Sequence, residues 1–257
     1  DHVVAEIEAR GGTAIADHGS VEDPQAPARL VETAMDRYGR LDVLVTSAGV
    51  SSPQIFHKTT AQNFRDVMEI NVTGTALIAA AASRVMREAG HGRIVLIAST
   101  AGLYGEPAVS AYAASKGAVI ALGRTMAVEG ERRGVLTNVL LPYADTQMTE
   151  SSMDHGQSAA LRPDLVAPIV TALARPDSTL NGEVIVAGAN GLRATETAET
   201  GTVLLPEGAL TPEELGGLLE GSRAGQRHTF AEAQTAFQDF AADVLGAQET
   251  TTGASDA

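Results

Sequence analysis

The segment "RIVLIASTAG" (Arg93–Gly102) begins with a run of aliphatic residues and then changes abruptly to small and polar ones. An apolar run without alternation is typical of a strand that is buried on both faces, as in a parallel sheet covered by helices. Similar runs occur at Leu41–Val45, Val135–Leu141 and Gly182–Gly188, with amphipathic segments between them. This alternation predicts an α/β fold built on a doubly wound parallel sheet.

The amphipathic segments predict helices, and their ends carry stop signals such as Gly39 and Gly90. Pro168 is expected to bend the last of them. The short pattern "TAIADH" (13–18) predicts one more strand. Helices are expected over a segment that starts near Ser20–Pro24 and carries an apolar stripe from Leu30 to Tyr38, and over Thr60–Ala89, Ser110–Arg133 and Asp164–Ala174.

Past residue 191 the strand and helix alternation ends. We expect an α/β domain over residues 1–191 and a helical extension over residues 192–244, which holds "TPEELGGLLEG" and "HTFAEAQTAFQDFAADVL". Residues 245–257 are polar enough to predict a disordered tail. The opening "DHVVAEIEARGG" reads as the back half of a helix that stops at two glycines.

The composition of the 257 residues disfavours several kinds of partner and site. The net charge is −14, with 32 acidic against 18 basic residues, which disfavours nucleic acid and anionic lipid as partners. No apolar run reaches the roughly 18 to 20 residues of a membrane span. The absence of cysteine excludes Cys-ligated zinc and thiolate catalysis, and we expect no metal site. A cytoplasmic location is expected.

Tyr112 and Lys116 in "SAYAASKGAV" lie four residues apart in a predicted helix, so both side chains share one face. A tyrosine has a pKa of about 10, and a neighbouring cation favours its phenolate form. Ser99 ends a predicted strand thirteen residues before Tyr112, which allows its hydroxyl to return beside the phenol. Together these groups are suited to hold a carbonyl oxygen.

These residues, with Asn71 in "EINVTGT", resemble the catalytic pattern of the short-chain dehydrogenase/reductase family, which has a Rossmann-like fold. The resemblance covers most of residues 4–189. It implies that Tyr112 exchanges a proton with the substrate oxygen and that Ser99 orients this oxygen. Lys116 then lowers the tyrosine pKa and binds the nicotinamide ribose, while Asn71 holds a helix bulge and a water that relays protons.

The same resemblance implies a nicotinamide cofactor and residues that bind it. Asp17 matches the aspartate that accepts from the adenine amino group. The family's N-N-A-G reads "TSAG" here, so Ser47, Ala48 and Gly49 follow Thr46 where the backbone approaches the cofactor ribose. In "LPYADTQMT", Pro142 keeps its place beside the cofactor, but no glycine follows it and Thr146 comes one residue early.

That shortened loop, with "GGTAIADHGSVED", "RPDLVAP" and the extension, resembles the (3R)-hydroxyacyl-CoA dehydrogenase modules of multifunctional β-oxidation enzymes and their free-standing bacterial relatives. This implies fatty acid metabolism, with oxidation of a 3-hydroxyacyl-CoA and NAD favoured over NADP. The alternatives are a 3-ketoacyl carrier-protein reductase and a non-catalytic partner subunit with the same fold. The family also implies a homodimer or homotetramer through the helices that carry Asn71 and Tyr112.

One family feature is missing from the 257 residues, because no glycine-rich phosphate loop precedes any helix. The family places its first strand, this loop and its second strand before the segment that matches here. We therefore expect the fold to be incomplete at its N-terminal side, with activity depending on that part. Pairing of a strand near Ala14 directly with Val43 would contradict this expectation.

Overall fold

The structure is a computed structural model that describes residues 2–146, 160–206 and 208–253, with the side chains of 247–253 left out. Its contacts divide the chain into two compact units, Asp1–Ala194 and Thr195–Ala257. The sequence analysis placed this change after residue 191. The two units are described separately below.

The first unit contains one five-stranded sheet in the order β1-β2-β3-β4-β5. The first four strands are parallel, which confirms the predicted α/β fold, and β5 is an antiparallel addition that the sequence analysis did not predict. A turn with positive φ at Ala189 and Asn190 joins β4 to β5. The strands are β1 (Val43–Thr46), β2 (Gly92–Ile97), β3 (Val135–Pro142), β4 (Val184–Gly188) and β5 (Gly191–Ala194).

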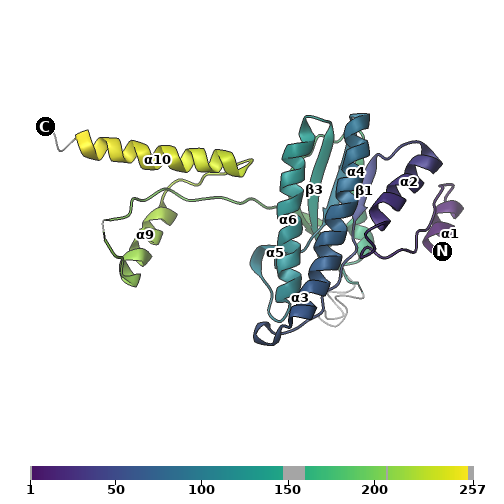
Figure 1. Cartoon of the computed structure of the whole chain (residues 1–257), viewed down its shortest axis with the longest axis horizontal. Coiled ribbons are helices and arrows are strands. Elements are labelled where there is room, and N and C mark those ends of the chain that lie inside the picture. Colours follow the sequence, from purple (N-terminus) through teal and green to yellow (C-terminus); the bar gives the residue numbers. More distant parts are fainter. Residues whose placement is uncertain (1, 147–159, 207, 254–257) are drawn as a thin grey trace. The chain divides into compact units, whose positions relative to one another are not determined.

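Helices cover both faces of this sheet. On one face, Met86 of α4 (Thr75–Ala89) and Val119 of α6 (Ser110–Glu131) pack with Ile94 and Leu96 of β2. Val95, the residue between those two, points the other way and packs with Leu173 of α8 (Ala167–Ala174). This alternation follows from the two-residue period of a strand. Figure 1 shows α4 and α6 side by side against the strands.

The helix predicted over Thr60–Ala89 is continuous but changes its type in the middle. It consists of α3 (Ala61–Met68), a π-helical segment η2 (Glu69–Gly74) and α4. The Thr60 hydroxyl caps its start by accepting from Asn63 N at 3.1 Å, and Gly90 ends it with φ 70°. A π-helical turn widens the helix locally, and such bulges are frequent at functional sites.

Short helices fill the remaining connections of the first unit. Pro168 lies in the first turn of α8, so the predicted bend is a break between η4 and α8. α5 between β2 and α6 was not predicted. These elements are α1 (His2–Ala9), η1 (Phe56–Lys58), α5 (Ala101–Tyr104) and η4 (Pro163–Leu165).

Two predictions at the start of the chain are wrong. Residues 13–18 form no strand, and Ile15 is 44% exposed. A strand needs a neighbour for its backbone groups, and the outer edge of β1 pairs with no described residue. α2 (Ala26–Tyr38) begins later than expected, with Pro27 rather than Pro24 in its first turn, although it ends at Gly39 as predicted.

The second unit contains the two predicted helices of the extension. α9 (Pro212–Ala224) begins with a capping box between Thr211 and Glu214. α10 (Ala233–Gly253) overlaps the start of the tail predicted from residue 245, and residues 254–257 lie outside the described part of the chain. Within the described ranges, every helix is too short or too polar to cross a lipid bilayer.

Candidate active site

The carboxyl ends of three parallel strands bring the predicted site residues to one edge of the sheet. Thr46 at the end of β1 pairs with Leu96, and Ile97 at the end of β2 pairs with Leu140. Ser99 therefore follows β2 at the edge where Ser47 follows β1. Pro142 is the last residue of β3 and lies at the same edge. Open α/β sheets bind ligands at this edge.

α6 brings Tyr112 and Lys116 to this edge, one turn apart as predicted. The ammonium nitrogen of Lys116 lies 5.7 Å from the centre of the Tyr112 ring. Lys116 is 5% exposed, and its Nζ donates to the carbonyl oxygen of Ile97 at 3.0 Å, at the end of β2. The lysine is therefore held between the helix and the sheet rather than in solvent.

A contact between two glycines sets how close Ser99 comes to α6. α5 begins two residues after Ser99, and its Gly102 lies against Gly117, the residue after Lys116. A Cβ built on Gly102 would lie 2.5 Å from Gly117 N and 2.6 Å from Lys116 C, so only glycine permits this approach. The Ser99 hydroxyl accepts from Ala101 N at 3.2 Å.

The direction of the Tyr112 pKa differs from the sequence-based expectation. Burial raises the pKa of Tyr112, and a hydrogen bond with the Ser99 side chain opposes this rise. Burial lowers the pKa of Lys116 to about 8, so the ammonium itself is easily neutralised.

Asn71 lies at the centre of a buried polar network that ties three elements together. Its side chain, 1% exposed in η2, donates to Val50 O at 2.9 Å and accepts from Val50 N at 2.8 Å. It also donates to the Ser115 hydroxyl at 2.8 Å, and Ser115 donates to Tyr112 O at 2.7 Å. The network fixes the segment after β1 against the helix that carries Tyr112.

Ser115 is a residue that the sequence analysis missed. Its side chain is fully buried, and it connects Asn71 to the backbone of Tyr112. The available signal was its position four residues from Ala111 and Val119, on the apolar stripe of α6. A hydroxyl on a buried helix face needs a hydrogen-bond partner, but the sequence alone does not identify that partner.

Several features at this edge fit the ribose and nicotinamide part of a dinucleotide. The Thr46 hydroxyl is buried and has no hydrogen-bond partner among the described residues. A Cβ on Gly49 would lie 3.2 Å from Asn71 Oδ1 and 3.5 Å from Lys116 Nζ, so the backbone passes close to both. An ammonium has three N–H donors, and Ile97 O takes one of them.

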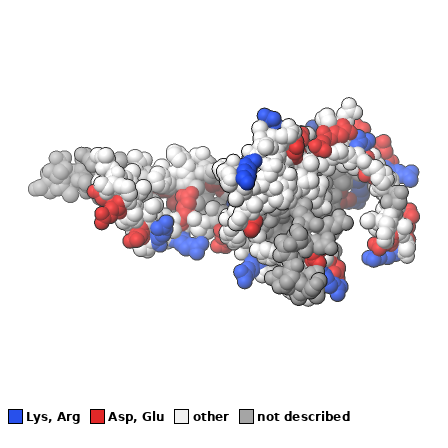
Figure 2. Space-filling view, turned by 90° about the horizontal axis from the view of Figure 1, so that it is seen from below, with Lys and Arg blue, Asp and Glu red and all other residues white. Residues whose placement is uncertain are grey.

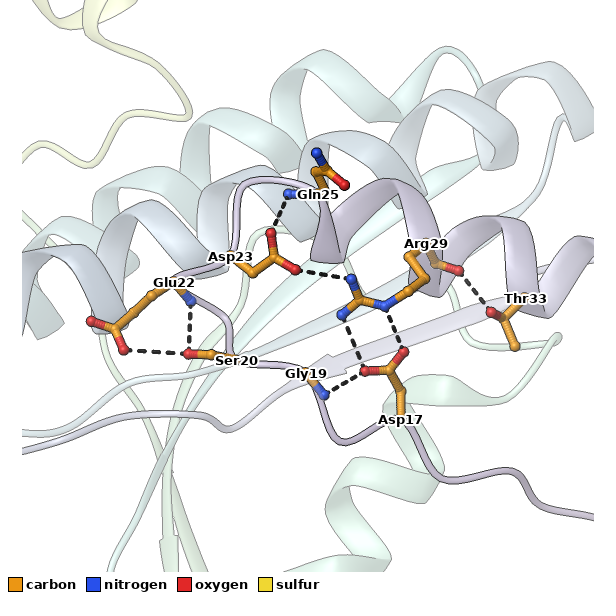
Figure 3. Close-up of polar contacts among 8 residues, drawn as sticks. All are labelled: Asp17, Gly19, Ser20, Glu22, Asp23, Gln25, Arg29 and Thr33. Atoms are coloured by element: carbon orange, nitrogen blue, oxygen red, sulfur yellow. Dashed lines mark hydrogen bonds and ion pairs between the residues drawn. The ribbon is translucent and has the colours of Figure 1, made fainter.

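The remaining predicted cofactor residues are placed with fewer contacts. Ser47 and Ala48 are exposed after β1, and Pro142 is partly buried at the end of β3. The Asp17 carboxylate accepts from Arg29 Nε at 2.9 Å and from Gly19 N at 2.7 Å (Figure 3). Asp17 thus has partners of its own, and its role toward adenine stays a prediction.

The buried ammonium of Lys116 leads to a stability prediction. Its pKa is 10.5 in the unfolded chain and about 8 in the folded one, so between these values only the unfolded chain holds the proton. Stability therefore rises with pH across this window, and below pH 8 the cost of burying the charge remains. This cost is about 3 kcal/mol, and the hydrogen bond to Ile97 O offsets roughly 1 kcal/mol of it.

We expect Lys116→Met to raise the free energy of unfolding by about 2 kcal/mol at pH 7. This advantage should disappear as the pH rises through 8 toward 10.5. Urea unfolding of the intact protein without dinucleotide, at pH 7 and pH 10, measures both values. A variant that is less stable than the wild type at pH 7 would contradict the assignment of a costly buried charge.

Comparison with known proteins places this geometry in a family. Residues 1–157 match the family described as short chain dehydrogenase. Peroxisomal multifunctional enzyme A of Dictyostelium discoideum is 35% identical over 215 residues, which cover 84% of this chain and 48% of that protein. A 3-oxoacyl-[acyl-carrier-protein] reductase of Synechocystis is 38% identical over 152 residues, 59% of this chain and 62% of that protein.

Solved structures agree with this result. Full-length peroxisomal multifunctional enzyme type 2 of Drosophila melanogaster matches with a TM-score of 0.79 at 28% identity, over 96% of this chain and 43% of that one. The structure of ElxO with NADP bound matches with a TM-score of 0.60 at 28% identity, over 66% of this chain and 75% of that one. This chain spans about half the length of its multifunctional relative in Dictyostelium. The family match over residues 1–157, together with the fold and the arrangement of its site, shows that the chain belongs to the short-chain dehydrogenase family.

Proposed function

We propose that the intact protein containing this chain is an NAD(P)-dependent oxidoreductase that interconverts a secondary alcohol and a ketone, with a 3-hydroxyacyl-CoA as substrate. The observation that supports this most directly is the meeting of three side chains at the carboxyl edge of the sheet. Tyr112 interacts with the Ser99 hydroxyl, and Lys116 lies beside the Tyr112 ring. The multifunctional relatives support an acyl-CoA substrate.

In the proposed oxidation, the alcohol proton passes to the Tyr112 phenolate as the carbon–oxygen bond becomes double. Ser99 donates a hydrogen bond to the same oxygen and so fixes its position. The bound nicotinamide supplies the hydride acceptor for oxidation and the hydride donor for reduction. Burial raises the pKa of Tyr112 and so favours the phenol, which is the form that donates a proton during ketone reduction, whereas the oxidation needs the phenolate.

The proposed cofactor residues are those at the carboxyl edge. Lys116 would bind the ribose hydroxyls with its remaining N–H donors, and the backbone at Ala48 and Gly49 would lie against the ribose. Ser47 and Pro142 would flank the nicotinamide end of the cofactor. Asp17 would accept a hydrogen bond from the adenine amino group at the other end. NAD is favoured over NADP on the resemblance to the hydroxyacyl-CoA dehydrogenase modules.

The 38% identity with a 3-oxoacyl-[acyl-carrier-protein] reductase supports a second candidate, the same chemistry run in reverse on a carrier-protein substrate. Both candidates are tested together with the intact protein. We expect NAD or NADP to bind, and reduced nicotinamide to form when a 3-hydroxyacyl-CoA is added. Faster turnover of a 3-oxoacyl carrier protein with NADPH would favour the second candidate. Failure of both dinucleotides to bind would exclude the oxidoreductase.

We also propose a homodimer or homotetramer that assembles through α4 and α6. Together these helices line a groove of about 850 Å³, which small residues such as Ala76 and Ala80 form on the α4 side. The groove is also lined by charged residues, namely Arg84, Glu88 and Glu129. Side chains of both signs are therefore available to form ion pairs with a second copy of the same surface. On the face that Figure 2 shows, acidic and basic side chains likewise lie interspersed.

We expect Ala80→Arg to weaken this assembly, because Ala80 is exposed on α4 and an arginine would fill the groove without disturbing the core. Sedimentation velocity of the intact protein should show a shift to a smaller species. Ala89→Arg at the end of α4 is the matched control, because Ala89 is exposed but does not line the groove. An unchanged sedimentation coefficient for Ala80→Arg would place the interface elsewhere.

The cytoplasmic location stays a prediction. Several relatives carry "peroxisomal" in their names, including those of Dictyostelium and Drosophila. Localising the tagged intact protein in its own cells would decide between the two compartments.

A further inference from the structure

The loop before α2 lies at the same edge of the sheet as the candidate site. A short connection after Gly39 joins the end of α2 to the start of β1, so the helix and the strand run in opposite directions. The start of α2 therefore lies at the carboxyl end of β1. Val21 in this loop packs against Gly74, the last residue of η2, where an added Cβ would lie 3.0 Å from Val21 Cβ. The same π-helical segment carries Asn71.

Arg29 in the first turns of α2 holds two carboxylates of this loop at once (Figure 3). Its Nε and Nη2 donate to Asp17 at 2.9 and 3.3 Å, and its Nη1 donates to Asp23 at 2.9 Å. Gly19 makes room for this arrangement, because a Cβ there would lie 2.0 Å from Arg29 Nη2. A two-pronged contact of this kind fixes the plane of the carboxylate as well as its position.

The Asp17 carboxylate keeps room for one more donor. Its Oδ1 accepts from Gly19 N and Arg29 Nη2, and its Oδ2 accepts from Arg29 Nε alone among the described residues. Each carboxylate oxygen has two acceptor positions, so Oδ2 has one left. The hydrogen bonds from Arg29 lower the pKa of Asp17, and the carboxylate stays an acceptor without a proton at neutral pH.

We propose that Arg29 is a positioning residue that aims the free acceptor of Asp17 Oδ2 at the base of the dinucleotide and so selects a base with an exocyclic amino group. This inference rests on the proposed function. An amino group donates to such an oxygen, whereas a carbonyl oxygen at the same place meets another acceptor and gains nothing. Arg29 thereby supports recognition of adenine against hypoxanthine without touching the cofactor.

The test is the ratio of dissociation constants for NAD and for nicotinamide hypoxanthine dinucleotide, measured by calorimetry with the intact protein. We expect the wild type to favour NAD about tenfold, which is the scale of one hydrogen bond to a charged group. Arg29→Leu and Gly19→Ala should bring this ratio close to one, the second by displacing the guanidinium. Arg29→Lys should restore part of the preference.

Arg40→Leu is the matched control, because Arg40 forms a similar two-pronged pair with Asp42 at the other end of α2. It should leave the ratio unchanged. A purely structural role of Arg29 would weaken both dinucleotides equally, so a preserved tenfold ratio in Arg29→Leu and Gly19→Ala overturns the inference alone. A wild type that binds both dinucleotides equally also overturns it, whereas one that binds neither removes the proposed function as well.

Discussion

Replacing Tyr112 by phenylalanine is expected to lower kcat/KM for the proposed 3-hydroxyacyl-CoA oxidation by about 10²- to 10⁴-fold, the usual contribution of a general acid or base. The substitution removes the hydroxyl that is proposed to exchange the proton, and it leaves the ring beside Lys116. The fold should persist, because the substitution removes one hydroxyl and keeps the partly buried ring.

Steady-state kinetics with the intact protein, together with dinucleotide binding, test this prediction. The dissociation constant for NAD should change little, because the phenol acts on the substrate oxygen. Tyr104→Phe is the matched control, since Tyr104 in α5 is 78% exposed and should lose no activity. A Tyr112→Phe enzyme that keeps more than a tenth of the wild-type kcat/KM would remove Tyr112 from its proposed role.

The parts of the site that local sequence determines were predictable. The apolar runs of β1 to β4 fix where each strand ends, and parallel strands end at one edge, so Ser99 had to lie there. The helical period placed Lys116 one turn from Tyr112, and the structure keeps them 5.7 Å apart from ring centre to nitrogen. These conclusions depended only on patterns among residues that are a few positions apart in the sequence.

The parts that depend on distant contacts were not predictable. Asn71 reaches Val50 and Ser115, which are 21 and 44 residues away, and no local pattern names them. The direction in which the pKa of Tyr112 shifts depends on how deeply the ring is buried, which packing alone decides. The predicted strand at residues 13–18 failed because strand formation depends on a neighbour as well as on residue type.

Arg93 also makes contacts with residues far away in the sequence, and it lies at the opposite end of β2 from Ser99. Arg93 is 7% exposed and forms no salt bridge with a described carboxylate, although its charge contributes to lowering the pKa of Asp177. It donates instead to the carbonyl oxygens of Pro176 and Ser178 at 2.8 and 3.0 Å, 83 and 85 residues along the chain. Two further acceptors are Gly92 O and Gly134 O. One side chain thus ties three connections at the amino edge of the sheet.

Arg93→Met is expected to lower the free energy of unfolding by about 3 to 5 kcal/mol, because it removes four hydrogen bonds that a buried guanidinium donates to backbone carbonyl oxygens. Thermal unfolding of the intact protein should show a fall of roughly 10 °C. Arg93→Lys should recover only part of this loss. A planar guanidinium can donate to carbonyl oxygens on both of its sides, whereas a single ammonium cannot reach all of them. The exposed Arg65 of α3 supplies the control, and Arg65→Met should change stability by less than about 0.5 kcal/mol.

The same variant separates stability from catalysis. Arg93 lies at the amino end of β2, while Ser99 follows its carboxyl end, so the folded fraction of Arg93→Met should keep its kcat/KM within about twofold. Tyr112→Phe should behave in the opposite way, with activity lost and the unfolding temperature nearly retained. If Arg93→Met unfolds within about 2 °C of the wild type, the four carbonyl contacts do not hold the amino edge together. If it instead loses activity while still folded, the two edges of the sheet are coupled.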